Sequence, residues 1–369
     1  MQISPFKIER YFARYEFNVD YVLCGSDCES MTIEDLLAFE PDAVDRFHRQ
    51  WLGYTDSQGS PSLRREICKI YRDIEPQQVL VHTGAEEAIF LFMHAMLSSE
   101  DHVIVHWPCY QSLVEVARSI GCEVTLWKAA EDNGWGLNID ELPQHIKPNT
   151  KAIVINTPHN PTGYLMPGDT FQEISRIAIA NGIILFSDEV YRESEYRLED
   201  RLPAACDFGE HSVSLGVMSK TYGLPGLRIG WIATQNKEIY NKMAVLKDYT
   251  TICSSAPGEF LAELALGHKS ALVERTRNII LDNLNVLDQF FARHADRFAW
   301  QRPTAGSIGF PKLLGGDVEV FCDSLVRTAG VLLLPGSVYD DPGNHFRIGF
   351  GRKNLPEAVG RLEDFLQKL

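Results

Sequence analysis

The chain has 369 residues, of which 45% are hydrophobic and 23% are charged, as in a folded protein with one large or two medium domains. A formal net charge of −15 argues against a general affinity for nucleic acid or for an anionic membrane, because both require basic patches. No apolar run is as long as a transmembrane helix and the N-terminus has no signal-peptide pattern, so we expect a cytoplasmic protein.

Residues 1–44 have a mixed composition with scattered aromatic residues, and we interpret them as an N-terminal arm or part of a small domain. Cys24 and Cys28 lie in Cys-Gly-Ser-Asp-Cys, but no Cys/His pair with zinc-like spacing accompanies them. Eight cysteines in so long a chain do not indicate a disulfide framework. We therefore expect free thiols and no metal site.

Pro61, with Ser60 before it, predicts the start of a helix that runs to Tyr71. From residue 79 the chain alternates between short apolar runs and segments with helical periodicity. This alternation predicts parallel strands in a three-layer α/β sandwich, with ligands at the carboxyl ends of the strands. Strands are predicted at 79–82, 103–106, 122–127, 152–155, 183–186, 212–217 and 229–233, and helices at 86–97, 110–120 and 171–180.

The pattern changes after about residue 267. A long helical pattern covers residues 270–298, and short strand candidates at 307–310, 331–334 and 346–348 and two helices follow. This α+β texture predicts a smaller C-terminal domain at 268–369, beside a large domain at 45–267.

Lys220 lies in a loop rich in glycine and proline between two apolar runs. A lysine held between buried strands loses solvation, which disfavours its charged form. Its neutral amine is then a nucleophile toward carbonyl compounds. The alternative is a surface lysine in an exposed loop, which is the usual environment of this residue type.

Two further loops follow predicted strands. Asn160 lies in a loop over 156–163, where two prolines and a glycine fix the backbone, although a plain turn is the alternative. Asp188 and Tyr191 follow the next strand. An aspartate there can keep a pyridinium nitrogen protonated, and a tyrosine hydroxyl can donate to a phenolate oxygen. The alternative for Asp188 is a helix N-cap.

Together these stretches resemble the class I/II aminotransferases, fold-type-I enzymes that depend on pyridoxal 5'-phosphate (PLP). The resemblance covers nearly the whole chain and implies a mostly parallel sheet in a three-layer sandwich plus a smaller α+β domain. Each motif alone is weak, but all three in family order and with family-like spacing are specific. The motifs are Asn-Pro-Thr-Gly at 160–163, Asp-Glu-Val-Tyr at 188–191 and Ser-Lys-Thr-Tyr-Gly-Leu-Pro-Gly-Leu-Arg-Ile-Gly at 219–230.

The resemblance implies a role for each matching residue around the cofactor. The catalytic group is Lys220 as the Schiff-base lysine, Asp188 as the partner of the pyridine nitrogen and Tyr191, with Asn160, as a donor to the phenolic oxygen. The remaining cofactor contacts are Tyr110 stacked on the ring (or packed in the core), a phosphate cup of Gly84, Ala85 and Glu86 at a helix N-terminus, and Ser219 and Arg228 on the phosphate.

The same resemblance implies a homodimer with composite active sites, in which Tyr54 reaches the phosphate bound in the neighbouring subunit. Arg347 matches the arginine that holds the substrate α-carboxylate through two parallel hydrogen bonds. Asn160 and Gly25 are expected beside the substrate.

Two positions depart from the family pattern. Val217, three residues before the lysine, stands where a serine often contacts the phosphate, which removes one hydroxyl donor. Residues 24–28 replace the usual Gly-x-Pro-Asp near the substrate side chain. This change indicates an unusual substrate or a divergent arm.

We therefore expect an aminotransferase that transfers the amino group of an α-amino acid to a 2-oxo acid through a Schiff base on Lys220. The alternative on the same fold is a PLP-dependent lyase or cyclase, of the capreomycidine-synthase type, because its first steps are identical. A PLP-sensing regulator is a third hypothesis, but no basic helix-turn-helix segment precedes Tyr54. No second arginine can be assigned to a side-chain carboxylate, so specificity for aspartate or glutamate is not supported.

Overall fold

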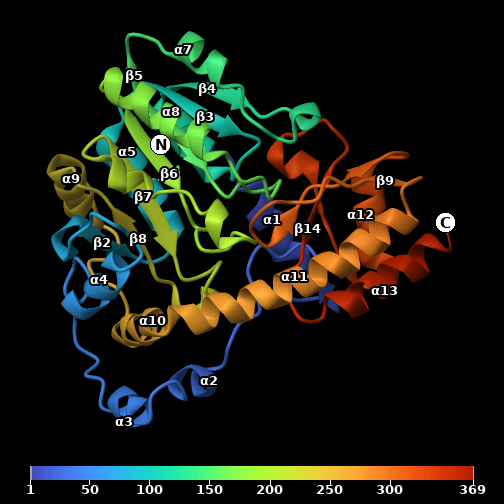
Figure 1. The fold of residues 1–369 in the computed structure, drawn as a ribbon, viewed down its shortest axis with the longest axis horizontal. Coiled ribbons are helices and arrows are strands. Elements are labelled where there is room, and N and C mark those ends of the chain that lie inside the picture. Colours follow the sequence, from blue (N-terminus) through green and yellow to red (C-terminus); the bar gives the residue numbers. More distant parts are fainter. Residues whose placement is uncertain (1, 369) are drawn as a thin grey trace.

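The computed structural model describes residues 2–368, and its centre is a seven-stranded sheet of order β2-β8-β7-β6-β5-β3-β4 (Figure 1). The strands from β7 to β4 in this order are parallel, whereas β8 is antiparallel to both of its neighbours. The strands are β2 (Val79–His82), β3 (His102–Trp107), β4 (Glu123–Lys128), β5 (Thr150–Asn156), β6 (Ile184–Asp188), β7 (Ser212–Val217) and β8 (Gly230–Ala233).

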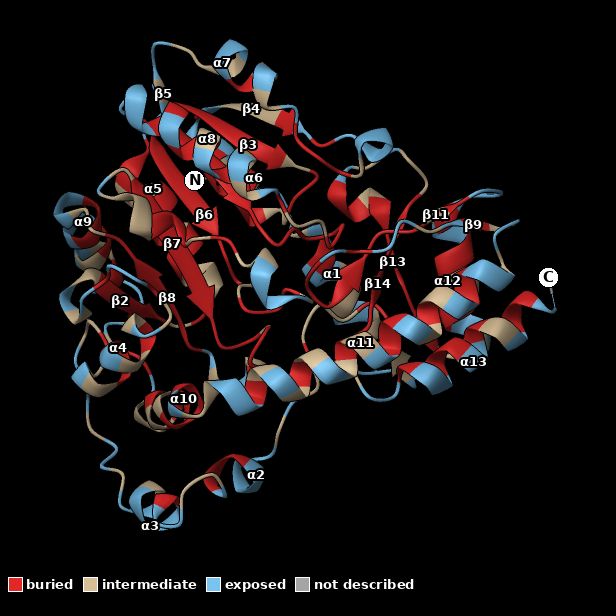
Figure 2. Ribbon diagram, viewed as in Figure 1, coloured by how far each residue is buried: buried red, intermediate tan, exposed pale blue. Residues whose placement is uncertain are grey.

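Side chains of the sheet alternate between two apolar layers, as the period of a strand requires. In β5, Ala152 and Val154 pack with α5 (Ala85–Met96), α6 (Ser112–Ile120) and α9 (Lys237–Lys247) on one face. Ile153 and Ile155 pack with α8 (Gly168–Ala180) on the other face. Figure 2 shows the buried strands between helices whose outer sides are exposed. The sheet is therefore the middle of the expected three-layer sandwich.

The segment before the sheet and the helix after it extend along the molecule. The N-terminal elements are α1 (Lys7–Tyr15), β1 (Tyr21–Val22), α2 (Ile33–Leu37), α3 (Ala43–His48) and α4 (Pro61–Cys68). Short α7 (Leu142–His145) precedes β5, and α10 (Ala256–Gly267) leads into α11 (Lys269–Arg293). Figure 1 shows α11 running from the sheet region to the C-terminal elements.

The C-terminal elements bury an apolar cluster of their own, which includes Leu23 and Cys28 from the N-terminal segment. Strand β1 pairs in parallel with β12, so residues near 20–29 join this part of the fold. The division of the chain at residues 44 and 267 stays a prediction. The C-terminal elements are β9 (Phe298–Ala299), β10 (Ile308–Gly309), β11 (Lys312–Leu313), α12 (Val318–Ala329), β12 (Val331–Leu332), β13 (Leu334–Pro335), β14 (Phe346–Gly349) and α13 (Leu355–Leu366).

The strand predicted near 229–233 is β8, which is antiparallel because the chain turns back after β7 without a crossover helix. Three expectations need correction. The helix that starts at Pro61 ends at Cys68, not at Tyr71, although Ser60 caps it as expected. The helix predicted to reach residue 298 ends at Arg293, because Phe298 pairs with Leu313. The strand predicted at 331–334 is two short strands, β12 and β13, with different partners.

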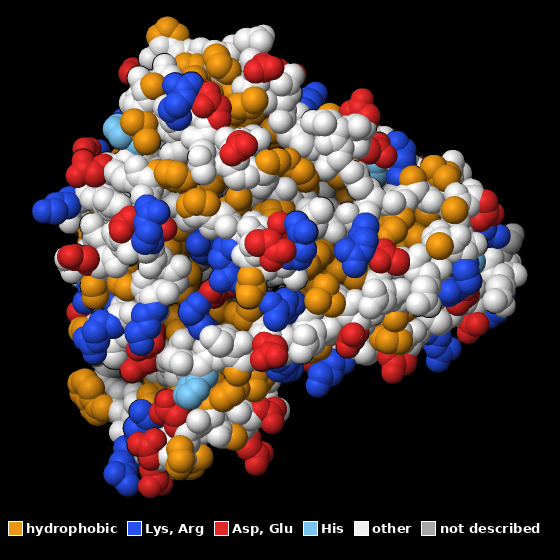
Figure 3. Space-filling model, viewed as in Figure 1, with side chains coloured by type: hydrophobic (Ala, Val, Ile, Leu, Met, Phe, Trp, Pro, Cys, Tyr) orange, Lys and Arg blue, Asp and Glu red, His pale blue; other side chains and the backbone are white. Residues whose placement is uncertain are grey.

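On the face seen in Figure 3, acidic and basic side chains are interspersed. Within residues 2–368, no helix is both long and apolar enough to span a membrane. All eight cysteines are free, Cys24 and Cys28 among them. In the same described range, no three His, Cys, Asp or Glu side chains are grouped as a metal ion would require.

Candidate active site

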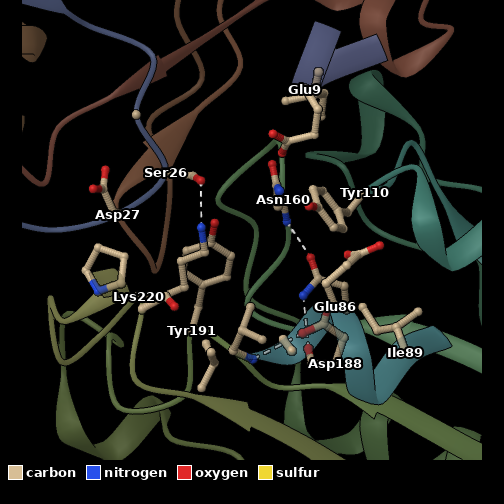
Figure 4. Close-up of a pocket in the computed structure, with 18 of the residues that line it drawn as sticks. Glu9, Ser26, Asp27, Glu86, Ile89, Tyr110, Asn160, Asp188, Tyr191 and Lys220 are labelled. Carbon is tan, nitrogen blue, oxygen red and sulfur yellow. Dashed lines mark hydrogen bonds between the residues drawn. The ribbon is translucent and has the colours of Figure 1, made fainter. Parts of the chain in front are cut away.

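A cavity of about 410 Å³ lies where the carboxyl ends of β5, β6 and β7 meet the start of α5, with α1 and residues 25–27 opposite. This volume is typical of a small-molecule site. Figure 4 shows side chains from these separate segments directed into one space. Eleven of the residues predicted from the sequence line it: Gly25, Ala85, Glu86, Tyr110, Asn160, Asp188, Tyr191, Ser219, Lys220, Arg228 and Arg347.

Lys220 follows β7 in the loop that leads to β8. Its Nζ atom donates a hydrogen bond to Oγ of Ser26 at 2.9 Å (Figure 4). Burial lowers the pKa of Lys220, because a buried ammonium loses its hydration, although the nearby carboxylate of Asp27 opposes this change. The surface-lysine alternative therefore does not describe this residue. Its amine is held inside the cavity, in a setting that favours the neutral form.

Asp188 ends β6 and is only 4% exposed. Burial raises the pKa of its carboxyl group to about 7, while the N–H of Val190, which donates to Oδ1 at 3.2 Å, opposes this change. No helix begins at this residue, so the N-cap alternative does not apply. The Asn156 side-chain amide and the Thr157 N–H donate to the Asp188 carbonyl at 2.9 and 3.0 Å. These bonds fix the backbone that presents the carboxyl group.

Asn160 is oriented by a hydrogen-bond relay that begins at Arg347. The guanidinium Nη1 donates to the Tyr339 hydroxyl at 2.6 Å, and that hydroxyl donates to Oδ1 of Asn160 at 3.0 Å. Because Nη1 also donates to Oδ1 at 3.3 Å, and a guanidinium cannot accept, this atom of Asn160 must be the oxygen. The Nδ2 donor is therefore left for a ligand. The Asn160 backbone N–H is fixed by Oδ1 of Asn156 at 2.6 Å.

Arg347 lies on β14 and is 1% exposed. Its Nε and Nη2 atoms donate to the carbonyl of Cys24 at 3.0 and 2.8 Å, which ties the N-terminal segment to the cavity. No carboxylate among residues 2–368 forms an ion pair with it. A buried guanidinium without an anion is costly, so the cavity is prepared for an anionic group.

Two tyrosines complete the side of the cavity near Asp188. The Tyr191 hydroxyl is buried and forms no hydrogen bond of normal geometry within residues 2–368, although the Ser26 side chain is near it, and burial raises its pKa. An unpartnered buried donor indicates a missing ligand atom. Tyr110 lines the cavity and also packs against Phe6, with ring centroids 5.0 Å apart. Tyr110 therefore both packs against an apolar neighbour and lines the cavity.

The start of α5 forms a cradle for an anion. Gly84 precedes the helix with φ of +84°, and no side chain caps this end. A Cβ atom at Gly84 would lie 2.6 Å from Nη2 of Arg228, so the missing side chain lets the guanidinium approach. A Cβ atom at Gly230 would lie 2.8 Å from the Ala85 nitrogen, so this glycine also keeps the cradle open. Free helix N–H groups beside an arginine are suited to a phosphate.

These features fit PLP, since the cavity offers an anion cradle, a buried carboxyl group, unused donors on Tyr191 and Asn160, and an amine. Ser219 is buried beside the lysine, and Val217 lines the cavity with an apolar side chain. Tyr54 does not line the cavity of this chain and is 83% exposed, so its role across an interface stays a prediction.

Several residues in or beside the cavity were not identified from the sequence. Ser26 binds the lysine, Asn156 fixes the backbone of Asp188 and Asn160, and Tyr339 orients Asn160. Asn156 had a signal, since it ends a predicted strand beside the recognised motif. Ser26 lies in the segment 24–28 that was expected near the substrate, but its contact with Lys220 had no signal, and Tyr339 had no signal at all. The acidic residues Glu9, Glu16 and Asp27 also line the cavity.

Comparison with known proteins agrees with this geometry. The family model described as aminotransferase class I and II matches residues 22–362. Among solved structures, a PLP-dependent aminotransferase from Streptococcus suis superposes with a TM-score of 0.94 and 33% identity, covering 100% of this chain and 99% of that one.

Curated relatives differ in the reaction that their names give. The aspartate aminotransferase of Geobacillus stearothermophilus is 28% identical, over 85% of this chain and 84% of its own length. The capreomycidine synthase of Streptomyces vinaceus is 27% identical, over 97% of this chain and 91% of its own length. The likeness therefore includes enzymes of two reaction classes.

The buried carboxyl group of Asp188 predicts a pH-dependent stability of the cofactor-free protein. Between about pH 4 and pH 7 the folded state keeps a proton that the unfolded state releases, so stability falls as pH rises through this window. The loss amounts to at most about 4 kcal/mol for a shift of about three pKa units. Asp188→Asn cannot ionise and does not lose this stability. The melting temperature of the variant minus that of the unchanged protein should therefore increase from pH 5 to pH 8.

Differential scanning calorimetry of cofactor-free protein measures this change. Asp132→Asn, at an exposed position, is the control and should run parallel to the unchanged protein. A gap between the Asp188→Asn and unchanged proteins that stays constant with pH would contradict the prediction.

Proposed function

The chain belongs to the aminotransferase class I and II family of PLP-dependent enzymes, and we propose that it is an aminotransferase that moves the amino group of an α-amino acid to a 2-oxo acid. One observation carries this proposal. The buried guanidinium of Arg347 has no carboxylate partner among residues 2–368, and it lines the same cavity as the amine of Lys220. An α-amino acid has a carboxylate that can pair with the Arg347 guanidinium. This carboxylate is bonded to the α-carbon, on which the Lys220 amine would act.

When bound, PLP supplies an electron sink for the α-carbon of the substrate. We propose that the residues identified by resemblance hold it. The N–H groups of Ala85 and Glu86, with Gly84 open before them and Ser219 and Arg228 beside them, bind the phosphate. Tyr191 and Nδ2 of Asn160 would hold its phenolic oxygen, and Tyr110 would lie against its ring. Asp188 would hold the ring nitrogen, where a cationic N–H group would stabilise its charge.

Lys220 would hold the cofactor through its aldehyde, and we propose that the amine of Lys220 moves the α-proton of the substrate. Its lowered pKa favours the neutral amine that both tasks require. Ser26 accepts a hydrogen bond from this amine, so the N-terminal segment holds the lysine on the side of the cavity that also contains Arg347. The residue that exchanges the proton thus lies near the residue that positions the substrate.

Arg347 is proposed to bind the α-carboxylate. Its rigid plane is held by the Cys24 carbonyl and the Tyr339 hydroxyl, so the carboxylate is bound in one orientation. Orientation matters because it decides which bond at the α-carbon is labilised. Gly25 and Asn160 line the same cavity, and we propose that they are neighbours of the substrate.

A PLP-dependent cyclase or lyase is the second candidate. The likeness to capreomycidine synthase extends over 97% of the chain, whereas the aspartate aminotransferase match covers 85%. Within residues 24–28, which depart from the family pattern, Gly25, Ser26 and Asp27 line the cavity. Both candidates need the same first proton transfer by Lys220. We further propose a cytoplasmic homodimer in which Tyr54 acts on the neighbouring site.

Lys220 should carry the cofactor. Borohydride reduction of the holoenzyme should leave the cofactor mass on the peptide that contains Lys220, as mass spectrometry will show. The matched internal control is Lys247, which is also buried but whose amine donates to the carbonyls of Ser57 and Ile252. Lys220→Ala should lose turnover by about a thousandfold or more, because base catalysis is removed. Label on another lysine would refute the assignment.

The reaction class should be visible in a single half-reaction. With its amino acid and no 2-oxo acid, an aminotransferase stops after one turnover and leaves the cofactor in its amino form. Absorbance and product yield per active site measure this outcome. Continued product formation without an amino acceptor would instead establish the cyclase or lyase.

Composite sites should allow complementation between inactive variants. A mixture of Tyr54→Ala and Lys220→Ala subunits should regain up to about half of the activity per mixed dimer, because one of its two sites carries neither change. The control mixture is Lys220→Ala with Asp188→Asn, in which every site keeps one defect. Equal activity of the two mixtures would argue against a site shared between subunits.

A further inference from the structure

Two hydrogen bonds outside the cavity join the loop after β7 to the turn after β6. The Thr221 hydroxyl donates to the Arg192 carbonyl at 2.8 Å. The Tyr222 hydroxyl donates to Oε2 of Glu193, also at 2.8 Å. Consecutive residues of one loop are thus bound to consecutive residues of the other, and the proposed function uses none of these four residues.

These bonds lie beyond the point where the sheet joins the two segments. Backbone pairing between β6 and β7 ends at Asp188 and Leu215. Lys220 and Tyr191 both follow these paired residues in the sequence. The sheet therefore sets the strand ends, and the two side-chain bonds complete the placement of the Lys220 amine relative to Asp188 and Tyr191.

The carboxylate of Glu193 is buried and is bound from two further directions. Glu193 is only 4% exposed. Nη1 of Arg201 donates to its Oε1 at 3.3 Å, and the Lys269 ammonium donates to the same oxygen. Lys269 is the first residue of α11, which runs toward the C-terminal elements (Figure 1). Because two cations already match this charge, the bond from Tyr222 is not needed to neutralise it.

The backbone of Glu193 also has an unusual conformation. Its φ is +72°, in the left-handed region that residues other than glycine rarely adopt. Such a conformation persists where the surrounding contacts hold it. Here the Glu193 N–H donates to Oε1 of Glu195 at 3.2 Å, and Nε of Arg201 donates to the other oxygen of Glu195 at 3.1 Å. The turn is therefore held in one shape and gives Tyr222 a fixed anchor.

We propose that Glu193 is a positioning residue, whose carboxylate holds the Tyr222 hydroxyl and thereby fixes the Lys220 amine relative to Asp188 and Tyr191. This inference rests on the proposed function. A reacting group gains rate when it is held in an attack geometry, and a displacement of about 1 Å can cost on the order of a hundredfold. Because Tyr222 and Lys220 share a short loop, loss of the anchor lets the amine occupy a wider range of positions.

Attachment of PLP to the cofactor-free chain tests the inference. In this step the Lys220 nitrogen forms a double bond to the aldehyde carbon, and the aldehyde oxygen leaves as water with the two amine protons. Stopped-flow absorbance should show attachment at least about tenfold slower in Tyr222→Phe and in Glu193→Gln than in the unchanged protein. Pyridoxine 5'-phosphate has the phosphate but no aldehyde. Its affinity, measured by calorimetry, should change by less than about twofold, because the phosphate cradle is untouched.

A double variant and a matched control locate the effect. Tyr222→Phe combined with Glu193→Gln should be no slower than the slower single variant, because both changes remove the same bond. The control is Tyr71→Phe, since Tyr71 lies in the same apolar cluster as Tyr222 and its hydroxyl accepts from Nε1 of Trp231 at 2.7 Å. This variant also loses one buried hydrogen bond and should attach PLP at the rate of the unchanged protein.

Each outcome decides one part of the inference. An unchanged attachment rate in Tyr222→Phe would overturn it, and in this variant Arg201 and Lys269 still pair with Glu193. An equal loss of affinity for the aldehyde-free compound would also overturn it, because the defect would then be a general loss of structure. Additive slowing in the double variant would rule out the bond between the two side chains as the cause. An unchanged protein that attaches no PLP at Lys220 would instead refute the proposed function, and the inference with it.

Discussion

Burial of the Arg347 guanidinium without a carboxylate is the constraint on which the substrate end of the cavity depends. Removing a cation from water costs several kcal/mol unless its donors are matched and a counter-charge is near. Here the donors are matched by neutral acceptors from three distant segments: the Cys24 carbonyl, the Tyr339 hydroxyl and the Asn160 amide. These bonds hold the N-terminal segment, β14 and the loop after β5 together. These bonds match the N–H donors of the guanidinium but do not neutralise its positive charge. An anionic ligand would supply the negative charge.

The same division between fixed geometry and unmatched charge applies to Asp188 and Lys220. Asp188 ends β6 and Lys220 follows β7 by three residues, and every residue of these two strands is buried, so the sheet sets the positions of both groups. Burial raises the pKa of the acid to about 7 and lowers that of the amine, so each group is moved toward its neutral form. In the cofactor-free chain this arrangement costs stability. It also prepares the site, since groups with perturbed pKa values gather where chemistry is performed.

The sequence was sufficient for those parts of the fold that local patterns determine. Buried strands such as β2 and β7 appear as apolar runs, and the loops between them carry motifs whose residues do meet in one cavity. The sequence was insufficient where contacts between distant segments determine the local structure. Phe298 belongs to a helical pattern but pairs with Leu313, and residues 331–334 divide between two partners. Ser26 and Tyr339 approach the cavity from the N-terminal segment and from the region before β14, and no spacing links either residue to Lys220 or Asn160.

The two walls of the cavity differ in origin. The wall that fits the cofactor comes from strand ends and the start of α5, whose positions the central sheet fixes. The opposite wall comes from α1 and residues 25–27, which are held by contacts such as Arg352 with Asp27 and Ser307 with the Ser26 carbonyl. The two walls are nevertheless joined, because Ile8 of α1 packs into the apolar cluster that contains Ile104 and Ile153 of the sheet. Lys220 and Asp188 thus belong to the wall that the sheet positions, whereas residues 25–27 depend on contacts between single side chains from distant segments.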